Sequence, residues 1–320
     1  MAGLIWIDDV RRNPIPEIRC VVSPGLVPNK GTFLLFGPPG IGKTWSFQQL
    51  GLEVDSGEDF LGFFLTEQRA VIYYDLEMGP IASMSRLTKT QKFYPNSHRF
   101  AILDSNIKLD SSGGKNILKG YVQEAQDKTG SAMLTLIDSI ARAGELGMVD
   151  EETIRRIIGN CKEMAESEST TFGFIGHSRK MTQFDYKGRQ VVREITLEDL
   201  RSTMALAFDV DTTIGIVRDI NAVDIADIAV VKSRHCPFPY QDLKFKAKFD
   251  RIKGTFRIVL PKHDLTIHKI SDLLKEKGPL VERDIYHTLH LSVGEARDAL
   301  NEMMSLWKCE LVNGRYKLNY

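Results

Sequence analysis

The sequence has few cysteines, no excess charge of either sign and no long apolar run. Its four cysteines are far apart and form no Cys-x-x-Cys pair, which argues against a zinc site or a disulfide framework and predicts reduced thiols in a cytoplasmic protein. Lys and Arg together number 42, as do Asp and Glu, so only local basic patches are available to hold nucleic acid. No uncharged stretch approaches the ~20 apolar residues that cross a membrane, so we expect no membrane partner.

What is present is an ordinary globular composition, with 42% hydrophobic and 26% charged residues. At ~150 residues per domain, 320 residues predict about two domains. Residues 1–30, which hold four prolines, are expected to form an irregular lead-in that packs on the main domain. The main domain is expected at 31–258 and a small separate domain at 262–320.

Continuous apolar strands alternate with helices through the first two thirds of the chain. Strands are expected at 32–36, 69–77, 99–104, 132–140 and 171–178, and helices at 43–54 and 150–167. Because strands that are apolar throughout are buried on both faces, the pattern predicts an α/β fold with a mostly parallel central sheet flanked by helices. Beyond about residue 205, several strand-like segments with short links predict antiparallel additions to one edge of that sheet.

The last 59 residues read as three short amphipathic helices and a hairpin. Ser292 and Glu295 form a capping-box pattern at the start of the third helix, and Asn313-Gly314 is a hairpin turn signal. This order predicts a winged helix-turn-helix domain. Its third helix carries more acids than bases, which disfavours a DNA phosphate backbone as its ligand. We therefore expect this domain to dock a protein partner, such as a replication protein, or to brace a ring of subunits.

Residues 37–44, GPPGIGKT, match the phosphate-binding pattern GxxxxGK[ST] between an apolar strand and a helix. The glycines let backbone N–H groups turn toward phosphates, Lys43 is expected to reach the β- and γ-phosphates, and the Thr44 hydroxyl is expected to bind Mg²⁺. The pattern therefore predicts ATP and Mg²⁺ as ligands. The expected nucleotide-binding residues are Gly37, Pro38, Pro39, Gly40, Ile41, Gly42, Lys43, Thr44 and Trp45.

Two strand ends supply carboxylates near this loop. Asp138 ends the strand LTLID and suits a water molecule in the Mg²⁺ shell, although a helix N-cap is the alternative role. Ser139 follows Asp138, so the carboxylate that orients the attacking water must come from elsewhere. Glu77 ends the strand after the phosphate-loop helix and is our candidate, with Asp75 competing two residues earlier.

The ordered set GPPGIGKTW, VIYYDLE, LTLIDSIAR, FIGHSRK, LRSTMAL and VVKSR resembles the RecA-like ATPases, and among them the RepA-type hexameric replicative helicases of plasmids. The resemblance covers about residues 25–250. It implies that Arg86 stacks on adenine and that His177 senses the γ-phosphate and relays its loss to the loop that follows. The winged-helix module departs from the minimal plasmid helicase.

The resemblance also implies a neighbouring subunit at the nucleotide. Lys232 and Arg234 of VVKSR are similar to residues that reach the γ-phosphate of the next subunit, and Arg201 of LRSTMAL is a second candidate finger. The sequence does not decide between Arg201 and Arg234. A finger acting between subunits implies a homo-oligomeric head-to-tail ring, expected to hold six subunits.

Residues 177–193 hold five bases against one acid, with Phe184 and Tyr186 among them. Basic groups follow a phosphate backbone and aromatic rings stack on bases, so this loop predicts single-stranded DNA in the channel of the ring. The candidate DNA-binding residues are Arg179, Lys180, Lys187 and Arg189.

The sequence thus favours an ATP-hydrolysing, ring-forming motor on single-stranded DNA, with DNA helicase as the activity. Two alternatives stay open: a RecA-like recombination or mediator ATPase that forms filaments, and a nucleotide-switched regulatory ATPase that acts through protein partners.

Overall fold

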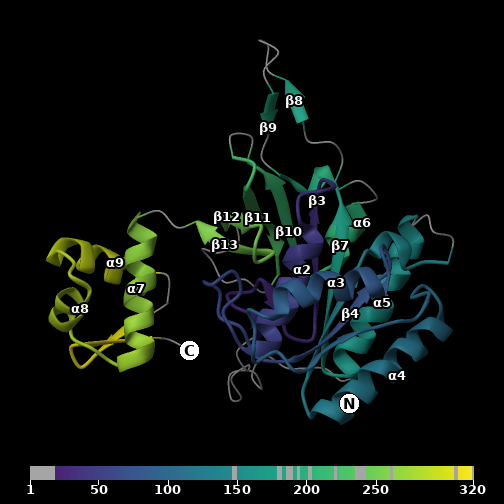
Figure 1. The fold of residues 1–320 in the computed structure, drawn as a ribbon, viewed down its shortest axis with the longest axis horizontal. Coiled ribbons are helices and arrows are strands. Elements are labelled where there is room, and N and C mark those ends of the chain that lie inside the picture. The colour runs from purple at the N-terminus through teal and green to yellow at the C-terminus, as the bar shows by residue number, and fades with distance from the viewer. Residues whose placement is uncertain are drawn as a thin grey trace, which may run out of the picture.

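The computed structural model describes residues 19–145, 150–178, 182–184, 190–192, 195–200, 204–219, 222–234, 243–259, 262–305 and 309–318. A nine-stranded sheet with the strand order β13-β12-β11-β10-β3-β7-β6-β4-β5 forms its centre (Figure 1). Its strands are β3 (Thr32–Gly37), β4 (Ala70–Asp75), β5 (Phe100–Ile102), β6 (Met133–Asp138), β7 (Thr170–His177), β10 (Thr212–Arg218), β11 (Ile225–Ser233), β12 (Lys244–Asp250) and β13 (Thr255–Val259).

The sheet is parallel from β10 to β5 and antiparallel from β10 to β13. Every residue of β3, β4 and β6 is buried, as the continuous apolar runs predict. The predicted antiparallel additions at one sheet edge are confirmed for β11, β12 and β13, whereas β10, expected among them, pairs with β3 in parallel. In β12 the exposed lysines alternate with less exposed residues, which is typical of a strand near a sheet edge.

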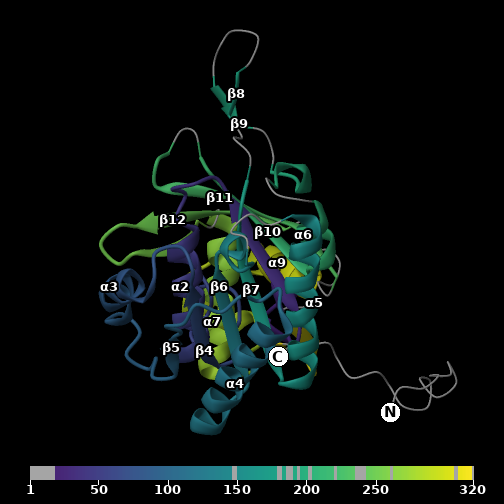
Figure 2. The same cartoon turned by 90° about the vertical axis from the view of Figure 1, so that its right-hand side faces the viewer.

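Helices cover both faces of the sheet (Figure 2). Helices α2 (Lys43–Ser56) and α3 (Pro80–Gln91) lie on one face, and α4 (Ser112–Thr129) and α5 (Glu151–Ser167) lie on the other. Each face has its own apolar core, one centred on α2 and one on α4 and α5. The fold is therefore the predicted mostly parallel α/β sheet flanked by helices.

Short elements complete the main body. Helix α6 (Met204–Asp209) precedes β10, and two 3-10 turns span Ile140–Arg142 and Leu197–Asp199. Strands β8 (Thr182–Phe184) and β9 (Gln190–Val192) pair with each other and project beyond the sheet in both views (Figures 1 and 2).

Three features differ from the sequence expectation. The lead-in is not wholly irregular, because β1 (Cys20–Val22) and β2 (Val27–Pro28) pair, and their valines are buried beside the α2 core. Strand β4 stops at Asp75, so Glu77 lies in the turn that follows it. Helices α3 and α4 were not assigned from sequence, since each buries only three residues.

A small C-terminal domain follows β13 and lies apart from the central sheet (Figure 1). It consists of α7 (Lys262–Lys277), α8 (Glu282–Leu289), α9 (Val293–Ser305), β14 (Cys309–Val312) and β15 (Arg315–Leu318), which pack around an apolar core of their own. The capping box at α9 is confirmed, since Ser292 and Glu295 exchange side-chain and backbone hydrogen bonds of 2.9 and 3.2 Å. An ion pair of 2.8 Å joins Lys275 to Asp59 of the main body.

None of the helices in the described residues combines the length and the apolar character that a membrane crossing requires.

Candidate active site

The phosphate loop connects β3 to α2, and its glycines are required by packing and by backbone conformation. Gly40 and Gly42 have φ angles of +74° and +101°, in the left-handed region that favours glycine. A Cβ atom on Gly42 would lie 2.8 Å from the Phe256 ring, and one on Gly37 would lie 2.2 Å from the Ile216 carbonyl oxygen. The loop therefore packs tightly between α2 and the antiparallel part of the sheet.

Lys43 opens helix α2 and turns back over the loop. Its Nζ donates hydrogen bonds to the carbonyl oxygens of Gly37 at 3.0 Å and Pro38 at 2.8 Å. Burial lowers the pKa of Lys43 to about 8, although the nearby charges of Asp138 and Glu77 oppose the shift. Most of the Lys43 population is therefore cationic at pH 7, as a phosphate ligand requires.

Asp138 ends β6 next to the first turn of α2. Its Oδ2 accepts hydrogen bonds from Thr44 Oγ1 at 2.7 Å and from the Tyr73 hydroxyl at 2.9 Å. Its Oδ1 is buried and accepts no hydrogen bond in the described structure. Burial raises the pKa of Asp138 to about 6, and the Thr44 and Tyr73 hydrogen bonds limit that rise.

The two candidate carboxylates, Asp75 and Glu77, have different environments in the turn after β4. Asp75 is buried, and its Oδ1 accepts the backbone N–H groups of Glu77 at 2.9 Å and Met78 at 2.8 Å. Its Oδ2 accepts a hydrogen bond from Ser83. The Glu77 side chain is 41% exposed, and its Oε2 lies 4.0 Å from His177 Nε2. The Asp75 carboxylate is therefore bonded within the turn. The Glu77 side chain is exposed and lines the cavity.

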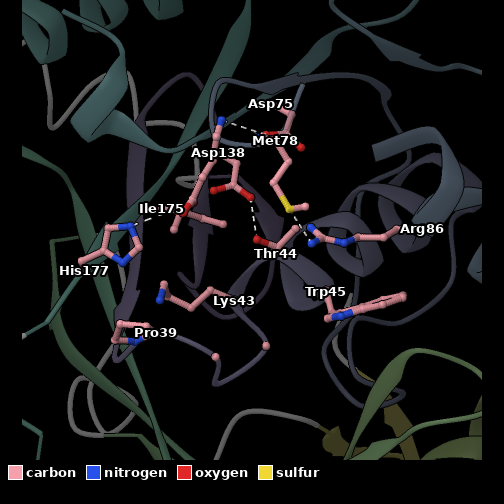
Figure 3. Close-up of a pocket in the computed structure, with 13 residues that line it drawn as sticks. Pro39, Lys43, Thr44, Trp45, Asp75, Met78, Arg86, Asp138, Ile175 and His177 are labelled. Atoms are coloured by element: carbon pink, nitrogen blue, oxygen red, sulfur yellow. Dashed lines mark hydrogen bonds and ion pairs between the residues drawn. The ribbon is translucent and has the colours of Figure 1, made fainter. Parts of the chain in front are cut away.

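These residues surround a cavity of about 260 Å³ (Figure 3). Ile175 and His177 of β7 line it on one side, and Trp45, Met78 and Arg86 line it on the other. The Arg86 guanidinium lies 6.0 Å from the centre of the Trp45 ring and donates a hydrogen bond of 2.7 Å to Met78 Sδ. A flat cation beside an indole is a surface on which a planar base can stack.

Of the predicted nucleotide-binding residues, seven line the cavity: Pro39, Gly40, Gly42, Lys43, Thr44, Trp45 and Arg86. Gly37, Pro38 and Ile41 do not line it. Gly37 and Pro38 hold the Lys43 ammonium through their carbonyl groups, and Ile41 is buried in the core beside α2.

Two contacts at the site were missed from sequence. Tyr73 is a buried hydrogen-bond partner of Asp138. The one sequence signal for it is strand alternation, which puts Tyr73 on the same strand face as Asp75, two residues later. Arg218 ends β10 and donates a hydrogen bond of 3.0 Å to the Gly40 carbonyl oxygen. Nothing in the sequence pattern relates Arg218 to the loop, since the pairing of β10 with β3 is a tertiary contact.

Lys232 and Arg234 lie at the other end of β3 from the phosphate loop. Lys232 Nζ donates hydrogen bonds of 2.7 to 2.8 Å to three carbonyl oxygens at the end of α6. Arg234 donates to the Phe208 carbonyl oxygen at 2.8 Å and lies 3.4 Å from Asp211. Asp211 in turn bonds Thr32, the first residue of β3. Burial and the Arg234 charge lower the pKa of Lys232 to about 8.

Five predicted site residues fall outside the described residues. They are the second candidate finger, Arg201, and the four DNA-loop residues, Arg179, Lys180, Lys187 and Arg189.

The residues present fit a nucleotide with its Mg²⁺. The loop leaves a cavity beside a buried lysine, and the unpaired Asp138 Oδ1 is a carboxylate oxygen suited to a hydrated cation. Within the described ranges, no group of three or more His, Cys, Asp or Glu side chains could hold a metal. Mg²⁺ is usually held by one or two protein ligands together with phosphates and water.

A phosphate loop between a buried parallel strand and a helix, with carboxylates at the neighbouring strand ends, defines a RecA-like P-loop ATPase. A protein-family model described as "AAA domain" matches residues 3–183. This match spans more than half of the sequence, so the chain belongs to the AAA domain family.

A solved structure shares the fold. A DnaB-like replicative helicase, reported with its interactions with primase, superposes with a TM-score of 0.56 and 17% identity, over 78% of this chain and 66% of that one, just under two thirds. A KaiC-like protein from Pyrococcus horikoshii gives 0.49 and 15%, over 75% of this chain and 94% of that one. No curated protein matches the sequence. At such identities the likeness concerns the fold alone.

Proposed function

We propose that this protein is a Mg²⁺-dependent ATPase that forms a head-to-tail ring and moves on single-stranded DNA, as a replicative-type DNA helicase of the RepA type. The AAA domain match and the phosphate-loop cavity support the ATPase part. The resemblance of the ordered motifs supports the helicase part.

The observation that supports the ring is that the phosphate loop and Arg234 lie at opposite ends of β3. The phosphate loop follows Gly37 at one end, and Arg234 is held through Asp211 beside Thr32 at the other end. At 3.3 Å per residue, these ends are about 17 Å apart. Arg234 therefore lies far from the cavity of its own subunit. In a head-to-tail ring, it would instead lie next to the nucleotide of the neighbouring subunit.

Each site residue has a role in this proposal. Thr44 and Asp138 hold the cation, which offsets the charge of the phosphates when bound. Glu77 orients the attacking water, and His177, 4.0 Å from Glu77, senses the γ-phosphate. Lys232 and Arg234 stabilise the transferred phosphoryl group of the next subunit. Arg201 is the alternative finger.

Arg86 and Trp45 take the adenine. Their side chains flank one side of the cavity, and the guanidinium and the indole already face each other at 6.0 Å. The phosphate-loop residues that line the cavity, Pro39, Gly40, Gly42, Lys43 and Thr44, take the phosphates.

Single-stranded DNA is proposed to bind the loop after His177, where β8 and β9 project from the body (Figure 1). Its basic residues Arg179, Lys180, Lys187 and Arg189 would follow the DNA backbone. Repeated around a ring, a locally basic loop makes a positive channel on a chain whose formal net charge is zero.

The C-terminal domain is proposed to be a winged helix that docks a protein, such as a replication protein. The first turn of α9 carries the acidic Glu295, and Arg297 is paired with Glu282 of α8 at 2.9 Å. A basic side chain engaged in this way contributes little to a DNA-binding surface.

The deciding experiment measures ATP hydrolysis with and without single-stranded DNA, particle mass by light scattering, and strand displacement on a forked duplex. Hydrolysis stimulated by DNA, a ring-sized particle and displacement support the proposal. Stimulated hydrolysis on filaments without displacement indicates a recombination or mediator ATPase. Slow turnover with tightly retained nucleotide indicates a regulatory ATPase.

A further inference from the structure

Two consecutive tyrosines of β4 face opposite sides of the sheet. Tyr73 packs in the core that α2 covers, and Tyr74 packs in the core that α4 and α5 cover. Both side chains are buried, with exposures of 0% and 1%. The strand pleat therefore brings only Tyr73 to the face on which the phosphate-loop helix lies.

The hydroxyl groups of the two tyrosines have different partners. The Tyr74 hydroxyl bonds the backbone of Ile107, accepting from its N–H at 2.6 Å and donating to its carbonyl at 3.0 Å. The Tyr73 hydroxyl donates to Asp138 Oδ2 at 2.9 Å. A phenylalanine at position 73 would keep the ring contact with Phe100 and avoid burying a hydroxyl. The feature that tyrosine adds at position 73 is therefore its hydrogen bond to Asp138.

That bond determines which oxygen of Asp138 is available. Thr44 and Tyr73 both donate to Oδ2, and Oδ1 is left buried and unpaired among the described residues. Two donors on one oxygen restrict the rotation of the carboxylate. A threonine hydroxyl has one proton and two lone pairs, so Thr44 can donate to Asp138 and still offer a lone pair to a cation.

We propose that Tyr73 is a positioning residue for the divalent cation: its hydroxyl holds the Asp138 carboxylate so that Oδ1 is presented to the hydrated metal that accompanies the nucleotide. The inference rests on the proposed ATPase function. Partners of this kind orient metal ligands, and their loss typically weakens metal affinity 10- to 100-fold.

The test compares Tyr73→Phe with Tyr74→Phe, two isosteric changes at adjacent buried positions. ADP binding to the full chain is measured by calorimetry over a MgCl₂ titration and again in EDTA, so that no turnover is needed. We expect Tyr73→Phe to raise the half-saturating Mg²⁺ concentration about 10- to 100-fold without changing ADP affinity in EDTA. We expect Tyr74→Phe to change the Mg²⁺ requirement less than about twofold, because its hydroxyl bonds backbone.

An unchanged Mg²⁺ requirement in Tyr73→Phe overturns the inference. An equal loss in both variants, together with equal falls in melting temperature, also overturns it, because it assigns the effect to packing. Wild-type ADP binding that does not depend on Mg²⁺ overturns the metal part of the proposed function itself, so the two failures are distinguishable.

A double-mutant cycle with Asp138→Asn separates the positioning of Asp138 by the Tyr73 hydroxyl from any independent effect of the Tyr73 side chain. If Tyr73 acts through Asp138, Tyr73→Phe has no further effect on the Mg²⁺ requirement once Asp138 is changed. Additive effects of the two changes contradict the inference.

Discussion

The Asp75 carboxylate accepts a hydrogen bond of 2.9 Å from the backbone N–H of Glu77. Two residues that compete for one role in the sequence therefore have different roles in the structure. Asp75 is buried and holds the turn, whereas Glu77 is partly exposed beside His177. Glu77 is the better candidate for orienting the attacking water because its side chain is exposed and lines the cavity, whereas the Asp75 carboxylate is bonded within the turn.

Changing Glu77→Gln is expected to lower the ATP hydrolysis rate about 10²- to 10⁴-fold, because the variant loses the group that accepts the proton of the attacking water. Nucleotide affinity should stay within a few-fold of the wild-type value. Single-turnover hydrolysis and equilibrium binding measure the two effects. Turnover at the wild-type rate in this variant would remove Glu77 from the mechanism.

Changing Lys43→Ala is expected to abolish nucleotide binding, because the loop loses its buried cation at the phosphates. The melting temperature without nucleotide should change little, since the hydrogen bonds of the Nζ to the described residues go to two carbonyl groups of its own loop. Lys89→Ala, on the exposed side of α3, is the matched control and should bind as the wild type does. Nucleotide binding by Lys43→Ala at wild-type affinity would contradict the assignment of the phosphate loop.

Arg234 is predicted to act on the nucleotide of the neighbouring subunit. Arg234→Ala and Glu77→Gln should each be inactive alone, and mixing them should restore hydrolysis where an intact arginine meets an intact glutamate. Mixing Glu77→Gln with the double variant Glu77→Gln/Arg234→Ala is the control, because no interface in it is complete. A mixture that stays as inactive as its components argues against action between subunits.

Lys232→Ala should behave differently from Arg234→Ala in a stability measurement. Its ammonium group satisfies three carbonyl oxygens at the end of α6, and losing it is expected to cost about 1 kcal/mol of unfolding free energy. Urea unfolding measures this cost. Equal stability of the variant and the wild type would leave Lys232 without a structural role in the isolated chain.

Changing Lys187 and Arg189 together to Ala is expected to reduce the stimulation of hydrolysis by single-stranded DNA and to lower the salt dependence of DNA binding, because fewer phosphates are neutralised. Hydrolysis without DNA should be unchanged. Unchanged stimulation would show that the DNA path lies elsewhere on the ring.

Glu53 of α2 predicts a pH dependence of folding stability. Burial raises its pKa to about 7, although hydrogen bonds from Gln49, Leu61 and Tyr94 and the charge of Arg257 oppose the shift. Between pH 4.5 and 7 the folded chain keeps a proton that the unfolded chain loses, so the stability that Glu53 contributes is lost as pH rises through this window.

The variant Glu53→Gln should reduce the dependence of the unfolding free energy on pH. The contribution of Glu53 to this slope is at most about 1.4 kcal/mol per pH unit. Denaturant unfolding at pH 5, 6 and 7 measures it. Glu166→Gln, on the exposed side of α5, serves as the control and should keep the wild-type slope. The same slope in Glu53→Gln as in the wild type would show that Glu53 is ionised across the range.

Much of the site could be predicted because it follows from local sequence. A buried strand, a glycine loop and a helix determine where Lys43 and Thr44 lie, and Asp138 ends a parallel strand whose C-terminal end must lie at the same edge. Helices α3 and α4 were missed because their buried faces are narrow and their apolar periodicity is weak. Glu77 was assigned to a strand because its apolar neighbours mask the turn that Asp75 builds.

By itself, the sequence determined the buried strands of the parallel sheet, the phosphate loop with its helix, and Asp138 at a strand end, because each depends on residues close together in the chain. The tertiary structure decided which of these groups meet. Pairing of β4 with β6 brings Tyr73 to Asp138, and pairing of β10 and β11 beside β3 places Arg218 at the loop and Arg234 at the opposite end. Strand order and register bring together residues that are far apart in the sequence. No local sequence pattern specifies which strands pair or in which register.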